Sequence, residues 1–410
     1  MTRENIRVAL FPCTYREIDG VANTSRQFAE FARERDYPFL LVHAGPSDEV
    51  SADGSLTRIQ LRRGRIKFPL DGQHEFDLLF LRHYSRILQI VRDFSPNVIH
   101  ITGPSDVGIL GALVAHNLGV TLAASWQTNV HQFARCRVSR LLSSWPKNIS
   151  NKIAAAAEVG SFHATARFYK IPRLLFTPNR ELVELLGKTT GKPCFLMGHS
   201  VNTDLFNPVF RERHAGDGPF QIGYVGRLTP EKNVRFLAQL EKDLLAKGNR
   251  DFRIVLIGQG AEEKWLRENM RHAEFRGWLT GKDLSRAYAG MDAFVFPSET
   301  DTFGLAVLEA LASGVPAVVT PRGGPAHTVE NGKSGYVANS YGEFASLLTI
   351  LMTEPERHES MRLEARQRAI SNGSWDRIFA GMYQAYERHT RIAAEAENVL
   401  LDDARKIVNT

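Results

Sequence analysis

Short apolar runs alternate with amphipathic stretches along most of the chain, and this alternation predicts strands followed by helices. The runs are four to six residues long, as expected for the buried strands of a parallel sheet. A further strand-like run, 161–166, lies between two predicted helices. Strands that alternate with helices build parallel sheets covered by helices, so the sequence predicts an α/β fold. The expected strands are 6–11, 39–43, 97–101, 120–125, 194–197, 221–225, 253–257, 274–277, 293–296 and 315–320.

The alternation is interrupted once, and this interruption divides the chain into two Rossmann-like halves. The stretch 207–218 is polar and contains a proline and two glycines, which is typical of an interdomain linker. We therefore predict an N-terminal Rossmann-like domain over 1–207 and a C-terminal Rossmann-like domain over 208–373. Further helices are expected over 374–410.

One predicted helix is apolar on every side except for a single carboxylate. It covers 303–312, after the strand 293–296, and its only charge is Glu309. Helical side chains lean toward the N-terminus, which directs Glu309 to the strand-to-helix turn where open α/β sheets bind ligands. A buried carboxylate must otherwise be paired or hydrogen-bonded. Two interpretations therefore remain open, a ligand-binding carboxylate or a buried one bonded to a neighbouring loop.

Two loops that directly follow strands are candidates for phosphate or nucleotide binding. The first, G-R-L-T-P-E-K-N, begins at Gly226 and carries Arg227 and Lys232 at a helix start. Two cations there suit a diphosphate, although a solvated loop is the alternative. The second, G-Q-G-A-E-E, contains Gly258 and Gly260 and is half of a dinucleotide fingerprint, without its third glycine. No complete fingerprint occurs in the chain, so a nicotinamide-dependent dehydrogenase is not predicted.

The composition is that of an ordinary globular protein. The chain has 410 residues, of which 43% are hydrophobic and 23% charged. Cys13, Cys136 and Cys194 lie far apart without metal-ligand spacing, so we expect reduced thiols and a cytoplasmic protein. No apolar run reaches the roughly 18 residues of a transmembrane helix, and no signal-peptide pattern precedes the first strand.

The net charge of +6 is unevenly distributed. The segment 133–175 contains eight lysines and arginines against a single acid, Glu158, with aromatic residues among them. Such a segment is typical of contact with an anionic membrane surface. It is also compatible with a solvated basic face that attracts an anionic substrate. We expect a membrane surface as a partner, at the inner face of the membrane, and no nucleic acid.

The stretch P-S-E-T-D-T-F-G-L-A-V-L-E-A-L-A-S-G-V-P over 297–316 resembles the signature of the family-four retaining nucleotide-sugar glycosyltransferases. That family carries a glutamate, seven residues, and a second glutamate. Asp301 stands in the first position here and Glu309 in the second. The resemblance extends over about 6–390 and implies the GT-B fold, two Rossmann-like domains with parallel sheets facing a central cleft. It also implies that the helices after 374 cross back to the N-terminal, acceptor-binding domain.

The resemblance implies a role for each matching residue. Arg227 and Lys232 would stabilise the departing diphosphate, Asp301 would bond sugar hydroxyls, and retention would proceed by front-face attack. No second carboxylate is placed for the covalent route of retaining glycosidases. We expect no metal ion and no cofactor besides the donor. The implied catalytic residues are Arg227, Lys232, Asp301 and Gln127, and the implied donor-binding residues are Gly20, Gly226, Gly258, Gly260, Phe303, Gly304, Leu305 and Glu309.

Two segments of the N-terminal half match the family less closely. Asp19 precedes Gly20 where the family usually has two glycines, and Gln127 stands where it often has a histidine. The glutamine is similar to that of bacterial lipid mannosyltransferases, which favours GDP-mannose over a UDP-hexose. Asp19, Asn129 and His131 are candidate contacts of the acceptor or sugar. For His131 an ordinary helix-start histidine is the alternative interpretation.

Taken with the resemblance, the sequence predicts a retaining hexosyltransferase. It would move a hexose from GDP-mannose or a UDP-hexose to a hydroxyl acceptor, such as a lipid or a lipid-linked glycan. The nearest subgroup is that of the lipid mannosyl- and sulfoquinovosyl-transferases. A sugar-nucleotide epimerase of the same fold and a non-catalytic nucleotide-sugar binding protein are the alternatives. The presence of Arg227, Lys232 and Glu309 favours an enzyme.

Overall fold

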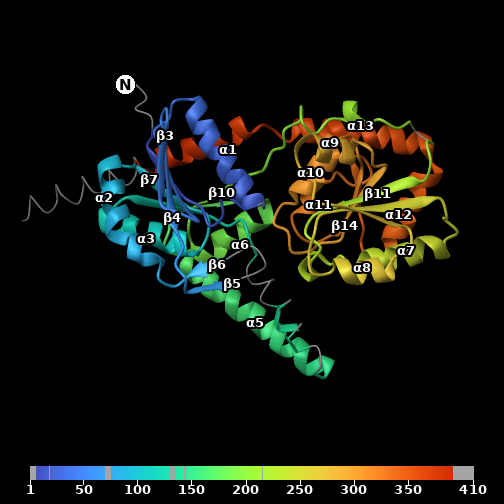
Figure 1. Ribbon diagram of the computed structural model, residues 1–410, viewed down its shortest axis with the longest axis horizontal. Helices are drawn as coiled ribbons and strands as arrows, with labels where there is room; N and C mark the ends of the chain where they lie inside the picture. Colours follow the sequence, from blue (N-terminus) through green and yellow to red (C-terminus); the bar gives the residue numbers. More distant parts are fainter. Residues whose placement is uncertain are drawn as a thin grey trace, which may run out of the picture. The chain divides into compact units, whose positions relative to one another are not determined.

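The chain folds into two units that are each built around a parallel sheet (Figure 1). The structure is a computed structural model. The first unit comprises Met1–Thr128, Phe162–Gly198 and Trp375–Thr410, and the second comprises Asn129–Ser161 and His199–Ser374. The described residues are 6–17, 19–69, 75–129, 135, 137–139, 141, 142, 145–214 and 216–390.

The first unit contains an eight-stranded sheet in the order β10-β9-β8-β7-β1-β2-β4-β3. Neighbouring strands are parallel except β3 and β4, which form an antiparallel edge. A short antiparallel pair, β5 (Lys67–Pro69) and β6 (Glu75–Asp77), stands apart from this sheet. The strands are β1 (Val8–Phe11), β2 (Phe39–Gly45), β3 (Glu49–Asp53), β4 (Leu56–Arg62), β7 (Val98–Ile101), β8 (Thr121–Ser125), β9 (Leu174–Thr177) and β10 (Cys194–Leu196).

Helices cover both faces of this sheet because successive strand residues point to opposite sides. Along β1, Val8 and Leu10 join one apolar core with α1, whereas Ala9 and Phe11 join another with α2 and α3. Both faces of the strand are therefore buried, which explains its continuous apolar run. The helices are α1 (Gly20–Glu34), η1 (Phe80–His83), α2 (Tyr84–Phe94), α3 (Asp106–Leu118), α5 (Lys147–Phe168), divided between the units after residue 161, and α6 (Arg180–Thr190).

A helix over residues 375–390 completes the core of the first unit. The ring of Phe379 stacks on Phe28 of α1, with 4.7 Å between ring centres. On the same helix the hydroxyl of Tyr386 lies 2.6 Å from Nδ1 of the buried His100 in β7. Burial lowers the pKa of His100 to about 3, so this contact joins two uncharged groups.

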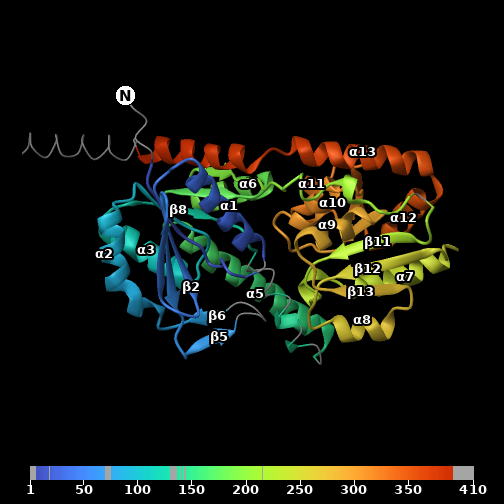
Figure 2. The same cartoon turned by 45° about the horizontal axis from the view of Figure 1, so that its top comes forward.

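The second unit contains a six-stranded sheet in the order β13-β12-β11-β14-β15-β16, with every neighbouring pair parallel (Figure 2). The strand order reverses between β11 and β14, which pair directly. One continuous apolar core packs its strands and helices together. The strands are β11 (Phe220–Val225), β12 (Phe252–Ile257), β13 (Ala273–Gly277), β14 (Ala293–Phe296), β15 (Ala317–Val319) and β16 (Gly335–Val337).

Helices and short turns connect these strands. The longest, α13, begins at a proline, a residue that suits the first turn of a helix. The connecting elements are η2 (Pro208–Phe210), η3 (Pro230–Lys232), α7 (Phe236–Ala246), α8 (Glu263–Asn269), α9 (Gly281–Ala289), α10 (Leu305–Ala312), α11 (Pro325–Thr328), η4 (Tyr341–Glu343), α12 (Phe344–Thr353) and α13 (Pro355–Ser371).

The structure corrects one expected element. Residues 161–166 are not a strand but part of α5, and the strand of this region is β9. The four alanines at 154–157 favour a helix, which continues through the following residues. The contact grouping changes unit after residues 198 and 374, compared with the predicted domain boundaries after 207 and 373. It also assigns 129–161 to the second unit. The predicted domain ranges remain predictions.

Candidate active site

The candidate site lies at the carboxyl ends of β11 and β14, where the strand order of the second sheet reverses. Open α/β sheets bind ligands at such a point because the two following loops leave in opposite directions. The loops are 226–232 after β11 and 297–304 after β14. They are joined by the hydroxyl of Thr300, which donates to the carbonyl of Glu231 at 3.1 Å. The structure thus brings together the two motifs that the sequence singled out.

Each candidate phosphate-binding cation of this site is paired with a carboxylate. The ammonium of Lys232 pairs with Asp301 across the two loops. The guanidinium of Arg227 lies 3.4 Å from the carboxylate of Glu231, four residues later. All four side chains are largely buried, at 15–21% exposure. The cations are therefore fixed in place, and a diphosphate would enter a site whose positive charge is already balanced.

Two polar atoms of these loops have no hydrogen-bond partner among the described residues. They are Oδ2 of Asp301 and the hydroxyl of Thr229, and both atoms are buried. Buried polar atoms are almost always satisfied, so an unsatisfied one in a native fold indicates a missing ligand or water. A ligand with hydroxyl or phosphate groups could form the missing hydrogen bonds with both atoms. Thr229 was not predicted from the sequence, although it precedes Pro230 in the predicted loop.

Gly258 and Gly260 support the cation-bearing loop from the neighbouring strand end. A Cβ atom at Gly258 would stand 2.0 Å from the carbonyl oxygen of Gly226, and one at Gly260 would stand 2.2 Å from that of Leu228. Only glycine permits this approach of two backbones. The N–H of Leu228 donates to the carbonyl of Gln259 at 2.9 Å, which holds the loops together. These predicted donor-binding glycines thus shape the loop that carries Arg227.

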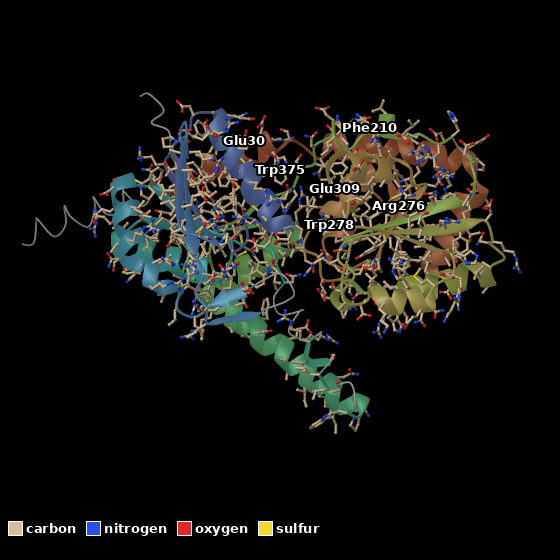
Figure 3. The ribbon with its side chains drawn as sticks, viewed as in Figure 1. Glu30, Phe210, Arg276, Trp278, Glu309 and Trp375 are labelled. Carbon is tan, nitrogen blue, oxygen red and sulfur yellow. The ribbon has the colours of Figure 1, made fainter. Side chains whose placement is uncertain are left out.

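Glu309 lies on α10 (Figure 3). The helix begins after Gly304, whose own backbone is in the left-handed conformation. Its Oε2 accepts a hydrogen bond of 2.8 Å from the hydroxyl of Tyr288, a buried residue of α9. Burial raises the pKa of Glu309 to about 7, and the bond from Tyr288 acts in the opposite direction. The side chain is only partly exposed. The hydrogen-bond partner of Glu309 therefore lies on a neighbouring helix, whereas the alternative interpretation of the sequence expected a neighbouring loop.

Phe303 and Leu305 flank Gly304 at the start of α10, and both are partly exposed. The first N–H groups of a helix have no partner within it, so those of Leu305 and Ala306 can donate to an anion, whereas the N–H of Val307 donates to the carbonyl of Gly304 at 3.0 Å. Phe303 also stacks on the ring of His199, with 4.6 Å between ring centres. This contact fixes the loop that precedes the helix.

Trp278 was missed by the sequence reasoning, although it follows β13 at the same edge of the sheet (Figure 3). It is 38% exposed. An exposed indole at a strand end offers a flat surface on which a planar ring can stack. The signal was present in the sequence, because Trp278 directly follows the glycine that ends the strand run 274–277.

The first unit carries three of the remaining candidates, Asp19, Gly20 and Gln127. Asp19 is the N-cap of α1, and its Oδ1 accepts from the N–H of Ala22 at 2.8 Å and from the hydroxyl of Thr14 at 3.0 Å. Gly20 is the first residue of that helix. Gln127, which follows β8, is buried. Asp19 thus has a structural role whatever it contacts, and the ligand roles of Gly20 and Gln127 remain predictions.

Asn129, assigned to the second unit, is buried, whereas His131 lies outside the described residues. In the described part of the chain, no group of three or more His, Cys, Asp and Glu side chains is arranged to hold a metal ion. Within the same residues, none of the helices combines the length and the apolar character that are needed to span a bilayer.

Comparison with solved structures shows the fold. The sucrose-phosphate synthase of Thermosynechococcus elongatus superposes with a TM-score of 0.71 at 16% identity, over 95% of this chain and 100% of that one. The HepE protein of Anabaena, in complex with UDP and glucose, gives a TM-score of 0.64 at 14% identity, over 93% of this chain and 100% of that one. The predicted α/β fold of the GT-B type is confirmed.

Comparison with sequences shows the family. The family described as Glycosyl transferases group 1 matches residues 207–368, and Glycosyl transferase 4-like matches 24–156. A GDP-mannose-dependent alpha-mannosyltransferase of Mycolicibacterium smegmatis is 31% identical over 310 residues, 74% of this chain and 76% of that protein. A sulfoquinovosyl transferase of Arabidopsis thaliana is 29% identical over 365 residues, 85% of this chain and 66% of that protein. The chain therefore belongs to the group 1, family-four glycosyltransferases, and it is a glycosyltransferase enzyme.

Proposed function

We propose that the enzyme transfers a hexose from a nucleoside-diphosphate sugar to a hydroxyl group of an acceptor, with retention of the anomeric configuration. The observation that carries this proposal is the ion pair of Lys232 and Asp301 at the reversal of the strand order. It puts a cation for phosphate and a carboxylate for sugar hydroxyls side by side. A site for a nucleotide-sugar needs these two chemistries at adjacent positions.

In the proposed reaction the diphosphate oxygens take the place of the carboxylates beside Lys232 and Arg227. The two cations then stabilise the negative charge that grows on the leaving group. Asp301, released from Lys232, accepts hydrogen bonds from hydroxyls of the transferred sugar. The acceptor hydroxyl oxygen attacks the anomeric carbon of the sugar from the same face that the diphosphate leaves. The bond from this carbon to the diphosphate breaks, and an oxygen of the departing diphosphate takes the proton of the acceptor hydroxyl. This route needs no second carboxylate beside the sugar, unlike the covalent route of retaining glycosidases.

The nucleoside would occupy the same edge of the sheet. Glu309 would accept hydrogen bonds from the ribose hydroxyls, and the exposed indole of Trp278 would stack on the base. GDP-mannose is the proposed donor, because mannosyltransferases named as GDP-mannose-dependent are among the relatives. Gln127 at the end of β8 supports this choice, and a UDP-hexose is the second candidate.

The proposed acceptor is a lipid or a lipid-linked glycan at an anionic membrane surface. Ile149 and Ile153 are spaced four residues apart on α5, so they share one side of the helix, and Trp145 lies two residues before the helix begins. The exposed fractions of these three side chains are 46%, 41% and 52%, in that order. Such exposed apolar side chains within the basic segment 133–175 suit the headgroup region of a bilayer. Part of that segment lies outside the described residues.

The test of the donor site is thermal stability with GDP, UDP, ADP and their sugar conjugates. A ligand at 100 times its dissociation constant stabilises the fold by about 2.7 kcal/mol. We expect this with GDP and GDP-mannose, and its loss in Arg227→Ala. Arg253→Ala is the matched control, since Arg253 is an exposed arginine on β12. No stabilisation by any nucleotide would refute the donor site.

Incubation of the donor without acceptor separates the proposed reaction from its alternatives. A transferase leaves GDP-mannose unchanged, apart from slow hydrolysis, until an acceptor is added. An epimerase of the same fold would convert the sugar while the nucleotide stays attached. A non-catalytic protein would bind the donor and turn over nothing under either condition. Chromatography of the nucleotides with and without a lipid extract distinguishes the three outcomes.

A further inference from the structure

A cavity of about 960 Å³ lies in the first unit, and none of its lining residues belongs to the candidate donor site. It opens at the carboxyl ends of β2 and β4, which are parallel neighbours ending at Gly45 and Arg62. The loop after β1 contributes Arg16 and Glu17. Carboxyl ends of parallel strands are the edge at which open α/β sheets bind ligands, and the volume suits a small molecule or a headgroup.

Two of the arginines that line this cavity are fixed by buried carboxylates. Arg63 contacts both oxygens of Asp106, with Nε–Oδ2 and Nη2–Oδ1 distances of 3.1 and 3.3 Å. Arg82 donates to Oδ2 of Asp77 at 2.6 Å. Asp77 also accepts a hydrogen bond of 2.6 Å from the N–H of Gly64, so the loop that follows β4 is held against Asp77. Each of these two ion pairs has no net charge, and together they form one wall of the cavity.

Three further arginines of the lining have no carboxylate partner among the described residues. Arg16 donates only to the neutral amide of Gln60, at 2.9 Å, and Arg62 and Arg65 are exposed at the end of β4. The backbone of Arg62 is nevertheless held, because its N–H donates to Asp48 at 2.9 Å and its carbonyl contacts Nε2 of His83 at 3.0 Å. The guanidinium of Arg62 is thus presented from a fixed position.

In the described part of the chain, the acidic side chains of the lining do not form ion pairs with these three arginines. Glu17, Asp48 and Glu75 equal in number the three arginines that remain once Asp77 and Asp106 are paired with Arg82 and Arg63. Glu17 lies 3.9 Å from Arg63, and Asp48 lies 3.8 Å from Arg86, which is outside the lining. Arg16, Arg62 and Arg65 therefore line the cavity without a carboxylate at ion-pair distance among the described residues. In the donor site, by contrast, each candidate cation already has its own carboxylate.

We propose that this cavity binds a phosphate group carried by the acceptor. The planar fork of a guanidinium matches two phosphate oxygens at once, and unpaired arginines at the ligand edge offer more than one fork. This inference rests on the proposed transferase function, since it names the class of acceptor. The phosphate can belong to a lipid headgroup or to a free polyol or sugar phosphate. Both present the same chemistry to Arg16, Arg62 and Arg65.

The test measures phosphate binding while the donor site is occupied. The full chain is saturated with GDP, and glycerol phosphate is then titrated by calorimetry. In parallel, phosphatidylglycerol vesicles are compared with phosphatidylcholine vesicles by co-sedimentation. The variants are Arg62→Gln and Arg65→Gln, and the control is Arg92→Gln, an exposed arginine of α2 outside the cavity. Loss of one charge-assisted contact is expected to weaken binding about tenfold.

Weakened binding in Arg62→Gln and Arg65→Gln, with Arg92→Gln unchanged, supports the proposal. A response only to glycerol phosphate assigns a soluble acceptor, and a response only to anionic vesicles assigns a lipid one. Equal binding by all variants overturns the proposal, as does the absence of binding to either probe. Because GDP binding is measured first, a failure of the donor site is seen separately from a failure of this cavity.

Discussion

The ammonium of Lys232 and the carboxylate of Asp301 form an ion pair between the loops that follow β11 and β14. Removing either partner leaves a largely buried charge without its counter-ion, which is unfavourable. We expect Lys232→Met and Asp301→Asn to be non-additive in urea unfolding, with a coupling energy of about 1–3 kcal/mol. The exposed pair of Lys333 and Glu330 is the control, for which no measurable coupling is expected because solvent screens it. Additive effects at Lys232 and Asp301 would contradict the assigned contact.

The raised pKa of Glu309 predicts a dependence of stability on pH. The folded chain keeps this proton up to about pH 7, whereas the unfolded chain loses it near the ordinary value of 4.5. The stability that the protonated group provides is therefore full below about pH 4.5 and is lost as the pH rises toward 7. The difference is up to about 3 kcal/mol at 1.36 kcal/mol per pH unit.

Glu309→Gln tests this directly, because the amide oxygen can still accept the bond from Tyr288 but carries no proton that titrates. Unfolding free energies of the two proteins are compared between pH 4.5 and 8. We expect the wild type to lose stability relative to Glu309→Gln across this range. Glu359→Gln, at an exposed carboxylate of α13, is the control and should follow the wild type. Parallel curves for Glu309→Gln and the wild type would refute the raised pKa.

The contact of Gly258 with the backbone of Gly226 predicts that Gly258→Ala is strongly unfavourable. The new Cβ would stand 2.0 Å from a carbonyl oxygen, and the φ of +131° is strained for any L side chain. We expect a loss of about 2 kcal/mol or more in urea unfolding, together with weaker GDP binding. Gly187→Ala in α6 is the control, since its Cβ meets nothing within 4 Å. That variant should be neutral or stabilised by up to about 1 kcal/mol.

The exposed apolar side chains of Trp145, Ile149 and Ile153, at and just before the start of α5, predict binding to anionic vesicles. The wild type should sediment with phosphatidylglycerol vesicles at low salt and be released near 1 M salt, where the Debye length is about 3 Å. Trp145→Ala and Ile149→Ala should weaken binding, because each removes exposed apolar area. Leu363→Ala on α13 removes an even more exposed apolar side chain elsewhere and should have no effect. Wild-type protein that stays in the supernatant at low salt would remove the membrane proposal.

Much of the fold was predictable because buried parallel strands appear in the sequence as continuous apolar runs. The strands β1 and β14, which such runs predicted, are buried at every position. The pattern failed where this condition does not hold. All residues of β3 are exposed, so no apolar run marks it. The run 161–166 resembled a strand, but the alanines before it extend α5 through these residues.

The site was predictable where one motif holds the chemistry, and less so where distant residues meet. Arg227, Lys232, Asp301 and Glu309 stand at recognisable spacings along the chain. The pairing of Arg227 with Glu231 follows from a four-residue spacing and could have been predicted. The bond from Tyr288 to Glu309 could not, because it depends on how α9 packs beside α10. The cavity of the first unit is similar, since its arginines come from several separate segments.

The helix over 375–390 belongs to the first unit, although the whole second unit precedes it in the chain. Phe28 of α1 packs on Phe379 of that helix, so this aromatic surface has no cover while the intervening residues are being translated. The second unit is in effect an insertion into the sequence of the first unit. On the ribosome all the strands of the second sheet are synthesised before the helix over 375–390, which the core of the first unit needs. The order of synthesis therefore imposes an order of folding, in which the unit that begins first is completed last.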